Sequence, residues 1–74
     1  MKEIEEINFK EEVKEGITLV DFYATWCGPC RMLHPVLEKL ASTRSEIDYK
    51  QIDVDNAPNI SKEYGVMSIP TLIL

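Results

Sequence analysis

The sequence is poor in several residue types, and each scarcity argues against a class of protein. Eight Lys and Arg stand against 13 Asp and Glu, which gives a formal net charge of −5. This shortage of positive charge argues against nucleic acid or an anionic membrane surface as a partner. No apolar run reaches the ~18 residues that a membrane-spanning helix needs. The acidic start M-K-E-I-E-E-I is unlike a secretory signal, and repeats and low-complexity tracts are absent.

Length and the count of metal-binding residues set further bounds. A chain of 74 residues allows one domain, predicted to span 1–74. A domain of this size buries only about 60% of its unfolded surface, so its stability is small. The 45% content of hydrophobic residues is typical of a globular protein. With two cysteines and one histidine, no four-ligand zinc site is expected within one chain. Two chains that share a metal through four cysteines are an alternative.

The chemistry is concentrated where an apolar stretch meets a helical pattern. Residues 17–23 are apolar except for Thr18 and Asp21, which is typical of a strand buried on both faces. A helix is predicted to follow the cysteines and to end near Thr43. Cys27 then lies at the start of this helix, where unpaired N–H groups and about half a positive charge favour the thiolate. The predicted inner side of the helix consists of Met32, Leu33, Val36, Leu37 and Leu40.

The spacing of the two cysteines bears on whether they form a structural link or a redox couple. Cys30 follows Cys27 by one helical turn, and Gly28 and Pro29 suit a tight turn and the first turn of a helix. Loop-closure entropy predicts that such a four-residue ring stabilises a fold by roughly 2 kcal/mol, less than a long-range bridge. A structural disulfide would join distant segments, so a switchable dithiol is the better interpretation.

Two separated motifs carry a family resemblance. Val20-Asp21-Phe22 precedes Trp26-Cys27-Gly28-Pro29-Cys30, Pro35 follows, and Ile69-Pro70-Thr71 stands near the end of the chain. Together they resemble the thioredoxin family, from about Ile4 to Leu74. The resemblance implies an α/β thioredoxin fold, with a mostly parallel central sheet flanked by helices.

The order of predicted elements agrees with that fold. Asn8 is predicted to cap the first helix, with Glu11 completing a capping box. Alternation of strands and helices implies a mostly parallel sheet covered on both faces. The predicted strands are 17–23, 47–54 and 71–74, with a short edge strand within 1–7, and the predicted helices are 8–15, the one ending near 43, and 59–64.

The resemblance also implies a last strand and a final helix that this sequence does not contain. We therefore expect a domain that is incomplete at the C-terminus. The apolar edge 71–74 is then available for pairing with another chain, and self-association through this edge is expected.

The resemblance implies roles for four residues around the motif. Cys27 is expected to attack a substrate disulfide and form a mixed disulfide, which Cys30, the more shielded thiol, then resolves. Asp21 is an acid inside an apolar strand, so burial should raise its pKa. The resemblance places Asp21 beneath Cys30 as its proton acceptor; the alternative is an acid held by hydrogen bonds at a strand end. Trp26 is expected to be an exposed docking surface rather than a core residue.

Other positions are expected to contact the substrate. Pro70 resembles the family's cis proline, which faces the cysteines and presents the backbone of Ile69 to a bound peptide. A trans proline at the start of a strand is the alternative. Gly28 and Pro29, between the thiols, complete the predicted substrate-binding residues.

Three further residues near the motif are weaker candidates. Arg31 either favours the Cys27 thiolate through its charge or is solvated. His34, four residues after Cys30, is expected to face solvent. Gln51 occupies a strand position where many members of the family carry a lysine near the buried acid.

The predicted function is a thiol–disulfide oxidoreductase that reduces protein disulfides. It needs no bound cofactor, and the resemblance implies electrons from an NADPH-dependent flavin enzyme, thioredoxin reductase. Its expected partners are that reductase and disulfide-containing proteins, in the cytoplasm, where thiols are kept reduced. The alternative is a non-catalytic truncated fragment that assembles with another chain.

Overall fold

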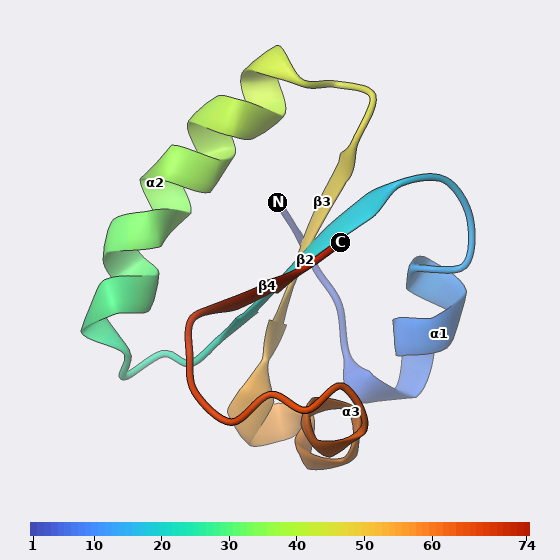
Figure 1. Ribbon diagram of the computed structural model, residues 1–74, viewed down its shortest axis with the longest axis vertical. Coiled ribbons are helices and arrows are strands. Elements are labelled where there is room, and N and C mark those ends of the chain that lie inside the picture. Colours follow the sequence, from blue (N-terminus) through green and yellow to red (C-terminus); the bar gives the residue numbers. More distant parts are fainter.

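A computed structural model describes residues 1–74 as a central sheet with helices on both sides (Figure 1). One helix, α2, lies on one side of the sheet, and α1 lies on the other. In chain order the elements are β1 (Lys2–Glu3), the 3-10 helix η1 (Glu6–Asn8), α1 (Phe9–Glu12), β2 (Thr18–Tyr23), α2 (Gly28–Thr43), β3 (Asp48–Asp53), the 3-10 helix η2 (Val54–Asn56), α3 (Pro58–Glu63) and β4 (Thr71–Ile73).

The sheet has four strands in the order β1-β3-β2-β4. Strands β1 and β2 both pair with β3 in parallel, and β2 places Asp21 beside Gln51. Strand β4 is antiparallel to β2, with Asp21 beside Leu72. The predicted mostly parallel sheet and the short N-terminal edge strand are therefore confirmed.

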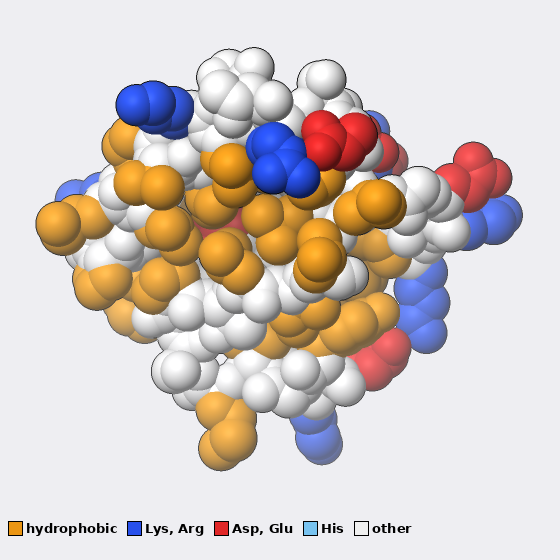
Figure 2. Space-filling model, turned by 45° about the horizontal axis from the view of Figure 1, so that its top comes forward, with side chains coloured by type: hydrophobic (Ala, Val, Ile, Leu, Met, Phe, Trp, Pro, Cys, Tyr) orange, Lys and Arg blue, Asp and Glu red, His pale blue; other side chains and the backbone are white.

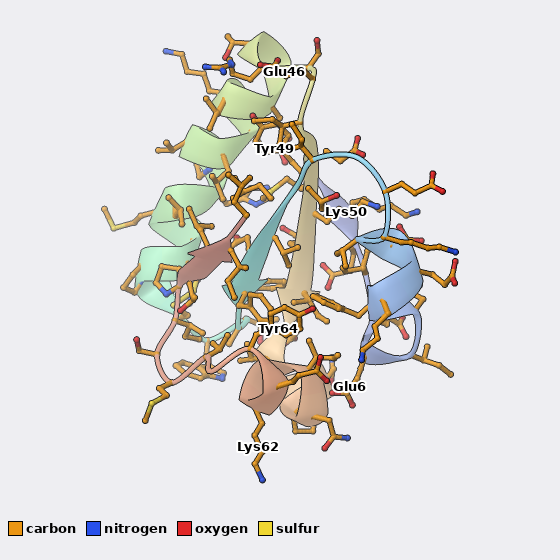
Figure 3. The ribbon with its side chains drawn as sticks, turned by 45° about the vertical axis from the view of Figure 1, so that its right-hand side comes forward. Glu6, Glu46, Tyr49, Lys50, Lys62 and Tyr64 are labelled. Atoms are coloured by element: carbon orange, nitrogen blue, oxygen red, sulfur yellow. A yellow bond between two sulfur atoms is a disulfide. The ribbon has the colours of Figure 1, made fainter.

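An apolar core lies on the face of the sheet under α1 and α3. Its centre is Phe22, which is fully buried, with Phe9 and Ile52 beside it. The rings of Phe9 and Phe22 lie 6.1 Å apart, and the ring of Tyr64 lies 5.2 Å from Phe9. Tyr64 reaches the core from the end of α3 (Figure 3). Aromatic and aliphatic burial on this face supplies the main stabilising term of the fold.

The first helix is shorter than the sequence predicts, and its start is built differently. Asn8 does not cap α1; its Oδ1 instead accepts a hydrogen bond from the N–H of Glu5 at 2.9 Å. Lys50 reaches from β3 toward α1 (Figure 3) and donates to both the carbonyl and the carboxylate of Glu12, the last helical residue. A lysine ammonium that takes a terminal carbonyl stabilises a helix end there. The predicted end at Glu15 is therefore wrong.

The long helix ends at Thr43 as predicted, but its predicted inner side is mostly wrong. Of the five apolar residues assigned to it, only Leu37 is buried. Met32, Val36 and Leu40 are exposed. Only two residues of α2, Cys30 and Leu37, are buried, and they lie two turns apart on the same side of the helix. The buried side of α2 is therefore narrower than the apolar spacing of the sequence predicts.

Strand β4 lies at the edge of the sheet and pairs only with β2. Its outer side is therefore open, as the sequence predicts. Leu72 within this strand and Leu74 directly after it are exposed. None of the helices is both long enough and apolar enough to cross a membrane.

Candidate functional site

The two cysteines form a disulfide at the N-terminus of α2. The Cα atoms of Cys27 and Cys30 are 5.3 Å apart. Cys27 is the N-cap of the helix, and its sulfur accepts a hydrogen bond from the N–H of Cys30 at 3.2 Å. After reduction, the same N–H and the helix dipole would stabilise a thiolate on Cys27. Cys30, inside the first turn, receives no such hydrogen bond. The helix start therefore distinguishes the two sulfurs.

Burial does not distinguish them. Cys27 and Cys30 are each only 4% exposed, so the prediction that Cys27 is the more open thiol is wrong for this disulfide form. Both lie in a small cluster with Ala24, against which Val54 and Ile69 pack. The cluster that buries Cys27 therefore includes contacts from β2, η2 and the segment before Pro70.

The residues between the cysteines are exposed, and only one of them has the predicted local role. Pro29 stands in the first turn of α2, where its missing N–H leaves no hydrogen bond unmade. Gly28 has no positive φ, and a Cβ there would meet nothing within 4 Å. The turn does not require glycine for its backbone, contrary to prediction. An open Gly28 does leave the approach to the disulfide free of a side chain.

A buried carboxyl shares a cavity with Cys30. Asp21 is only 2% exposed, and its Oδ1 has no hydrogen-bond partner in the protein. The cavity has a volume of about 180 Å³. It is large enough for several water molecules, which need polar walls. Its lining consists of Asp21, Tyr23, Ala24, Thr25, Cys30, Arg31, His34 and Gln51.

Burial raises the pKa of Asp21, as the sequence predicts. The positive charge of His34 acts in the opposite direction, and the negative charge of Glu3 raises the pKa further. Glu3 is fixed behind the cavity because its Oε1 accepts hydrogen bonds from the Tyr23 hydroxyl at 2.7 Å and from Gln51 Nε2 at 2.8 Å. Gln51 therefore brings no charge to Asp21 and is itself held by Glu3. The sequence does not predict that Glu3 accepts hydrogen bonds from Tyr23 and Gln51, because a two-residue strand has no pattern that would fix its register.

Trp26 lies on the surface, with 65% of the residue exposed. Its ring nitrogen donates a hydrogen bond to Asp55 Oδ2 at 2.8 Å. Asp55 is in turn positioned by Asp53, whose Oδ1 accepts the Asp55 N–H at 2.9 Å. The sequence pattern singles out neither of these two acids.

An apolar groove runs between Trp26 and the segment before β4. It has a volume of about 360 Å³. Ile69, at its end, packs against the cysteine cluster, and the Ile69–Pro70 peptide bond is cis, as the resemblance implies. The groove therefore extends from the exposed tryptophan to residues that pack against the cysteine cluster. Its lining consists of Trp26, Val54, Val66, Met67, Ser68 and Ile69.

The remaining candidates lie on α2. Arg31 and His34 both line the cavity of Asp21 while remaining exposed to solvent. His34 Nε2 lies 3.8 Å from Glu38 Oε1. No three Cys, His, Asp or Glu side chains come together in an arrangement that could hold a metal ion.

Fold and site define a class of protein: an α/β domain with a dithiol–disulfide couple at a helix N-terminus above a buried acid. The family model described as thioredoxin matches residues 1–74. A thioredoxin of Listeria monocytogenes is 49% identical over the whole chain, which covers 73% of that protein. A thioredoxin of Chlamydia trachomatis is 48% identical over 90% of the chain and 66% of its own length.

Solved structures agree with these relatives. The structure of Trichomonas vaginalis thioredoxin superposes with a TM-score of 0.86 at 36% identity, over 97% of this chain and 68% of that one. Mitochondrial thioredoxin 3 of Saccharomyces cerevisiae, in its oxidised form, gives 0.88 at 36% identity, over 97% and 70%. The chain belongs to the thioredoxin family. Together with the paired cysteines, this supports a thiol–disulfide oxidoreductase.

Proposed function

We propose that this chain reduces disulfides in other proteins, with Cys27 as the attacking thiol and Cys30 as the resolving thiol. The observation that carries the proposal is the Cys27–Cys30 disulfide at the start of α2, where the Cys30 N–H points at the Cys27 sulfur. That hydrogen bond favours negative charge on Cys27 once the pair is reduced. The thiolate is the form that attacks a disulfide.

The first step forms a mixed disulfide. The Cys27 thiolate attacks one sulfur of the substrate disulfide, and a bond forms between them as the substrate S–S bond breaks. The other substrate sulfur leaves with the electron pair and takes a proton from solvent.

The second step releases the substrate. The Cys30 thiol gives its proton to the Asp21 carboxylate across the shared cavity, and its sulfur then attacks Cys27. The Cys27–substrate bond breaks, and the second substrate sulfur leaves and takes a proton. Two electrons have passed to the substrate, and Cys27 and Cys30 are again a disulfide.

The groove beside the disulfide is the proposed seat of the substrate chain. Trp26 and Met67 expose apolar surface there, and Ile69 and Pro70 bring backbone close to the sulfurs. An extended peptide would pair with the free backbone groups of this segment. Gly28 and Pro29 border the approach without side chains that block it.

Thioredoxin reductase is the proposed source of electrons, because the family implies it as a partner. The two thiols carry the chemistry on side chains alone, so no bound cofactor enters the proposed steps. A reducing compartment such as the cytoplasm suits this function, since the thiols must spend much of their time reduced.

Insulin reduction tests the proposal directly. Purified protein with a chemical reductant should precipitate insulin faster than the reductant alone. Cys27→Ser should abolish the effect. Cys30→Ser should accumulate a covalent adduct with insulin that intact mass detects and dithiothreitol removes. An adduct on Cys27→Ser and none on Cys30→Ser would reverse the assigned roles, and no acceleration by the unsubstituted protein would refute the function.

The surface offers one observation in favour of a non-catalytic module that assembles with another chain. Val36 and Leu40 on α2 are exposed, as are Leu72 and Leu74 at β4. Figure 2 shows hydrophobic side chains spread over one face of the molecule. A protein that associates but does not reduce insulin would fit this alternative. We favour the reductase, because an assembly role alone does not explain the placement of Asp21 behind Cys30.

A further inference from the structure

His34 is joined to the reactive site by the cavity that it lines with Asp21 and Cys30. It follows Cys30 by four residues on α2, so it stands one turn further along the same side of the helix. Its side chain is 48% exposed. The residue therefore touches solvent on one side and the cavity on the other.

A charge at the position of His34 acts on the Asp21 carboxyl, which lines the same cavity. Its Oδ1 is buried without a hydrogen-bond partner, and its strand neighbour Gln51 is neutral and held by Glu3. Glu3 adds a negative charge behind the cavity. The positive groups that line the cavity are Arg31, whose charge is permanent, and His34, whose charge depends on pH.

The groups around His34 leave its charge available to the cavity. On its own helix, Glu38 Oε1 lies 3.8 Å from His34 Nε2, but the same oxygen accepts a shorter hydrogen bond, 2.6 Å, from the Met1 ammonium. From the sheet, the cavity presents Asp21 and the Tyr23 ring. Burial and the hydrogen bond to Glu3 raise the pKa of Tyr23, so this phenol stays neutral.

We propose that His34 is a positioning residue for the release step, and that its protonated ring keeps the Asp21 side chain ionised and able to accept the Cys30 proton. The inference rests on the proposed reductase function and deepens it. In this chain the positive charge that lowers the pKa of Asp21 would come from His34 on α2, since the neighbouring position in the sheet holds the neutral Gln51. The influence of His34 on Asp21 is favourable to the carboxylate, because its positive charge lowers the pKa that burial raises.

The sign of the pH dependence follows. A positive charge on His34 stabilises the Asp21 carboxylate, so release of the substrate stays fast to lower pH than it would without that charge. Without that charge, Asp21 takes up its proton at higher pH, and the acid limb of the release step moves upward. At high pH Asp21 is ionised with or without a neighbouring positive charge, so the unsubstituted protein and both His34 variants should release the substrate at the same rate there.

The test is a carbon-13 NMR titration of the Asp21 carboxyl in the oxidised protein, assigned by its loss in Asp21→Asn. His34→Gln should move its midpoint to higher pH, and His34→Lys should bring it back to or below the original value. Lys39→Gln removes a charge from the same helix away from the cavity lining, and should leave the midpoint unchanged. Neither exposed position is expected to impair folding.

A kinetic measurement completes the test. At pH 6 the rate of mixed-disulfide release should fall at least about threefold in His34→Gln and recover in His34→Lys. An unmoved Asp21 midpoint in His34→Gln overturns the inference, even if insulin is still reduced. Failure of the unsubstituted protein to reduce insulin, with the midpoint shifted as expected, instead refutes the proposed function and with it the positioning role of His34 in the release step.

Discussion

The two faces of the sheet use alternate residues of the same strands, and they differ in what they bury. On the face under α1 and α3, Phe22 packs against Phe9 and Ile52 in an apolar cluster. On the face toward α2, the next residue along β2 is Asp21, which borders a cavity with Cys30. One strand therefore supplies both the centre of the core and the acid of the site.

The contrast shows how a small domain separates stability from chemistry. Burial of apolar area stabilises the first face, whereas burial of a carboxyl without a partner costs free energy on the second. Apolar burial on the first face offsets that cost. Asp21 cannot leave its position, since strand pairing fixes it between Gln51 and Leu72.

The largest expected effect is the loss of stability from a substitution in the apolar core under α1 and α3. Phe22→Ala should lower the free energy of unfolding by about 3–5 kcal/mol, because it leaves a cavity where the ring packs. A domain of this size has a total stability of only about 5 kcal/mol or somewhat more, so much of the variant should be unfolded. Urea denaturation followed by circular dichroism measures the loss. A cost under about 1 kcal/mol would show that this cluster does not hold the fold together.

A smaller effect of opposite sign is expected on the site face. Burial raises the pKa of Asp21 in the folded state, so the folded protein binds its proton more tightly than the unfolded chain does. The stabilising contribution of the protonated form is therefore complete below the unfolded pKa and is lost as pH rises through the folded pKa. Asn does not ionise, so the Asp21→Asn variant does not lose this stability as pH rises.

The Asn variant should thus gain stability relative to the original protein as pH rises from 3 to 7, by about 1.4 kcal/mol for each unit of raised pKa. Urea denaturation at several pH values gives the difference. A difference that does not change with pH would contradict the raised pKa of Asp21.

The two faces differ in how far the sequence reveals them. The alternation of Val20, Asp21 and Phe22 and the pair of cysteines predict the central strand, the helix start and the raised pKa of the acid. These features depend on neighbours in sequence and on local hydrogen bonds, which a pattern records. The mostly parallel sheet is also confirmed, because alternating strands and helices favour parallel pairing through crossover connections. The family is confirmed because two separated motifs carry the resemblance.

The parts that failed depend on contacts between distant segments. The apolar spacing of α2 does not say which side meets the sheet, so Val36 and Leu40 were wrongly assigned to the interior. Cys27 is buried in a cluster against which Val54 and Ile69, both distant in sequence, pack, and the end of α1 depends on Lys50. Hydrogen bonds from Trp26 to Asp55 and from Gln51 to Glu3 have no signature in sequence, because each joins two separate elements.

A smaller effect on stability is expected from the hydrogen bond between Trp26 and Asp55 at the edge of the site. Asp55→Ala removes the acceptor of the Trp26 hydrogen bond and should cost about 0.5–1.5 kcal/mol, typical of one such bond. Asp55→Asn keeps an acceptor oxygen and serves as the matched control. Tryptophan fluorescence of the folded protein should change in the first variant and much less in the second. Equal spectra for the two variants would contradict the hydrogen bond between Trp26 and Asp55.

The smallest effect is expected on the outer side of α2. Val36 is 60% exposed, so Val36→Ser should change the free energy of unfolding by no more than about 0.5 kcal/mol. The measurement is made at two protein concentrations. A larger loss that depends on concentration would show that another copy covers this side of the helix, as the assembly alternative requires.

The most direct test of the division between the faces is the rate of mixed-disulfide release in Asp21→Asn, measured by stopped-flow at pH 7 with folding checked on the same sample. The account predicts release at least about tenfold slower, with formation of the mixed disulfide little changed and stability equal or higher. Unchanged release would contradict the role of Asp21 as proton acceptor. A loss of stability comparable to that of Phe22→Ala would show that this face, too, is built for folding.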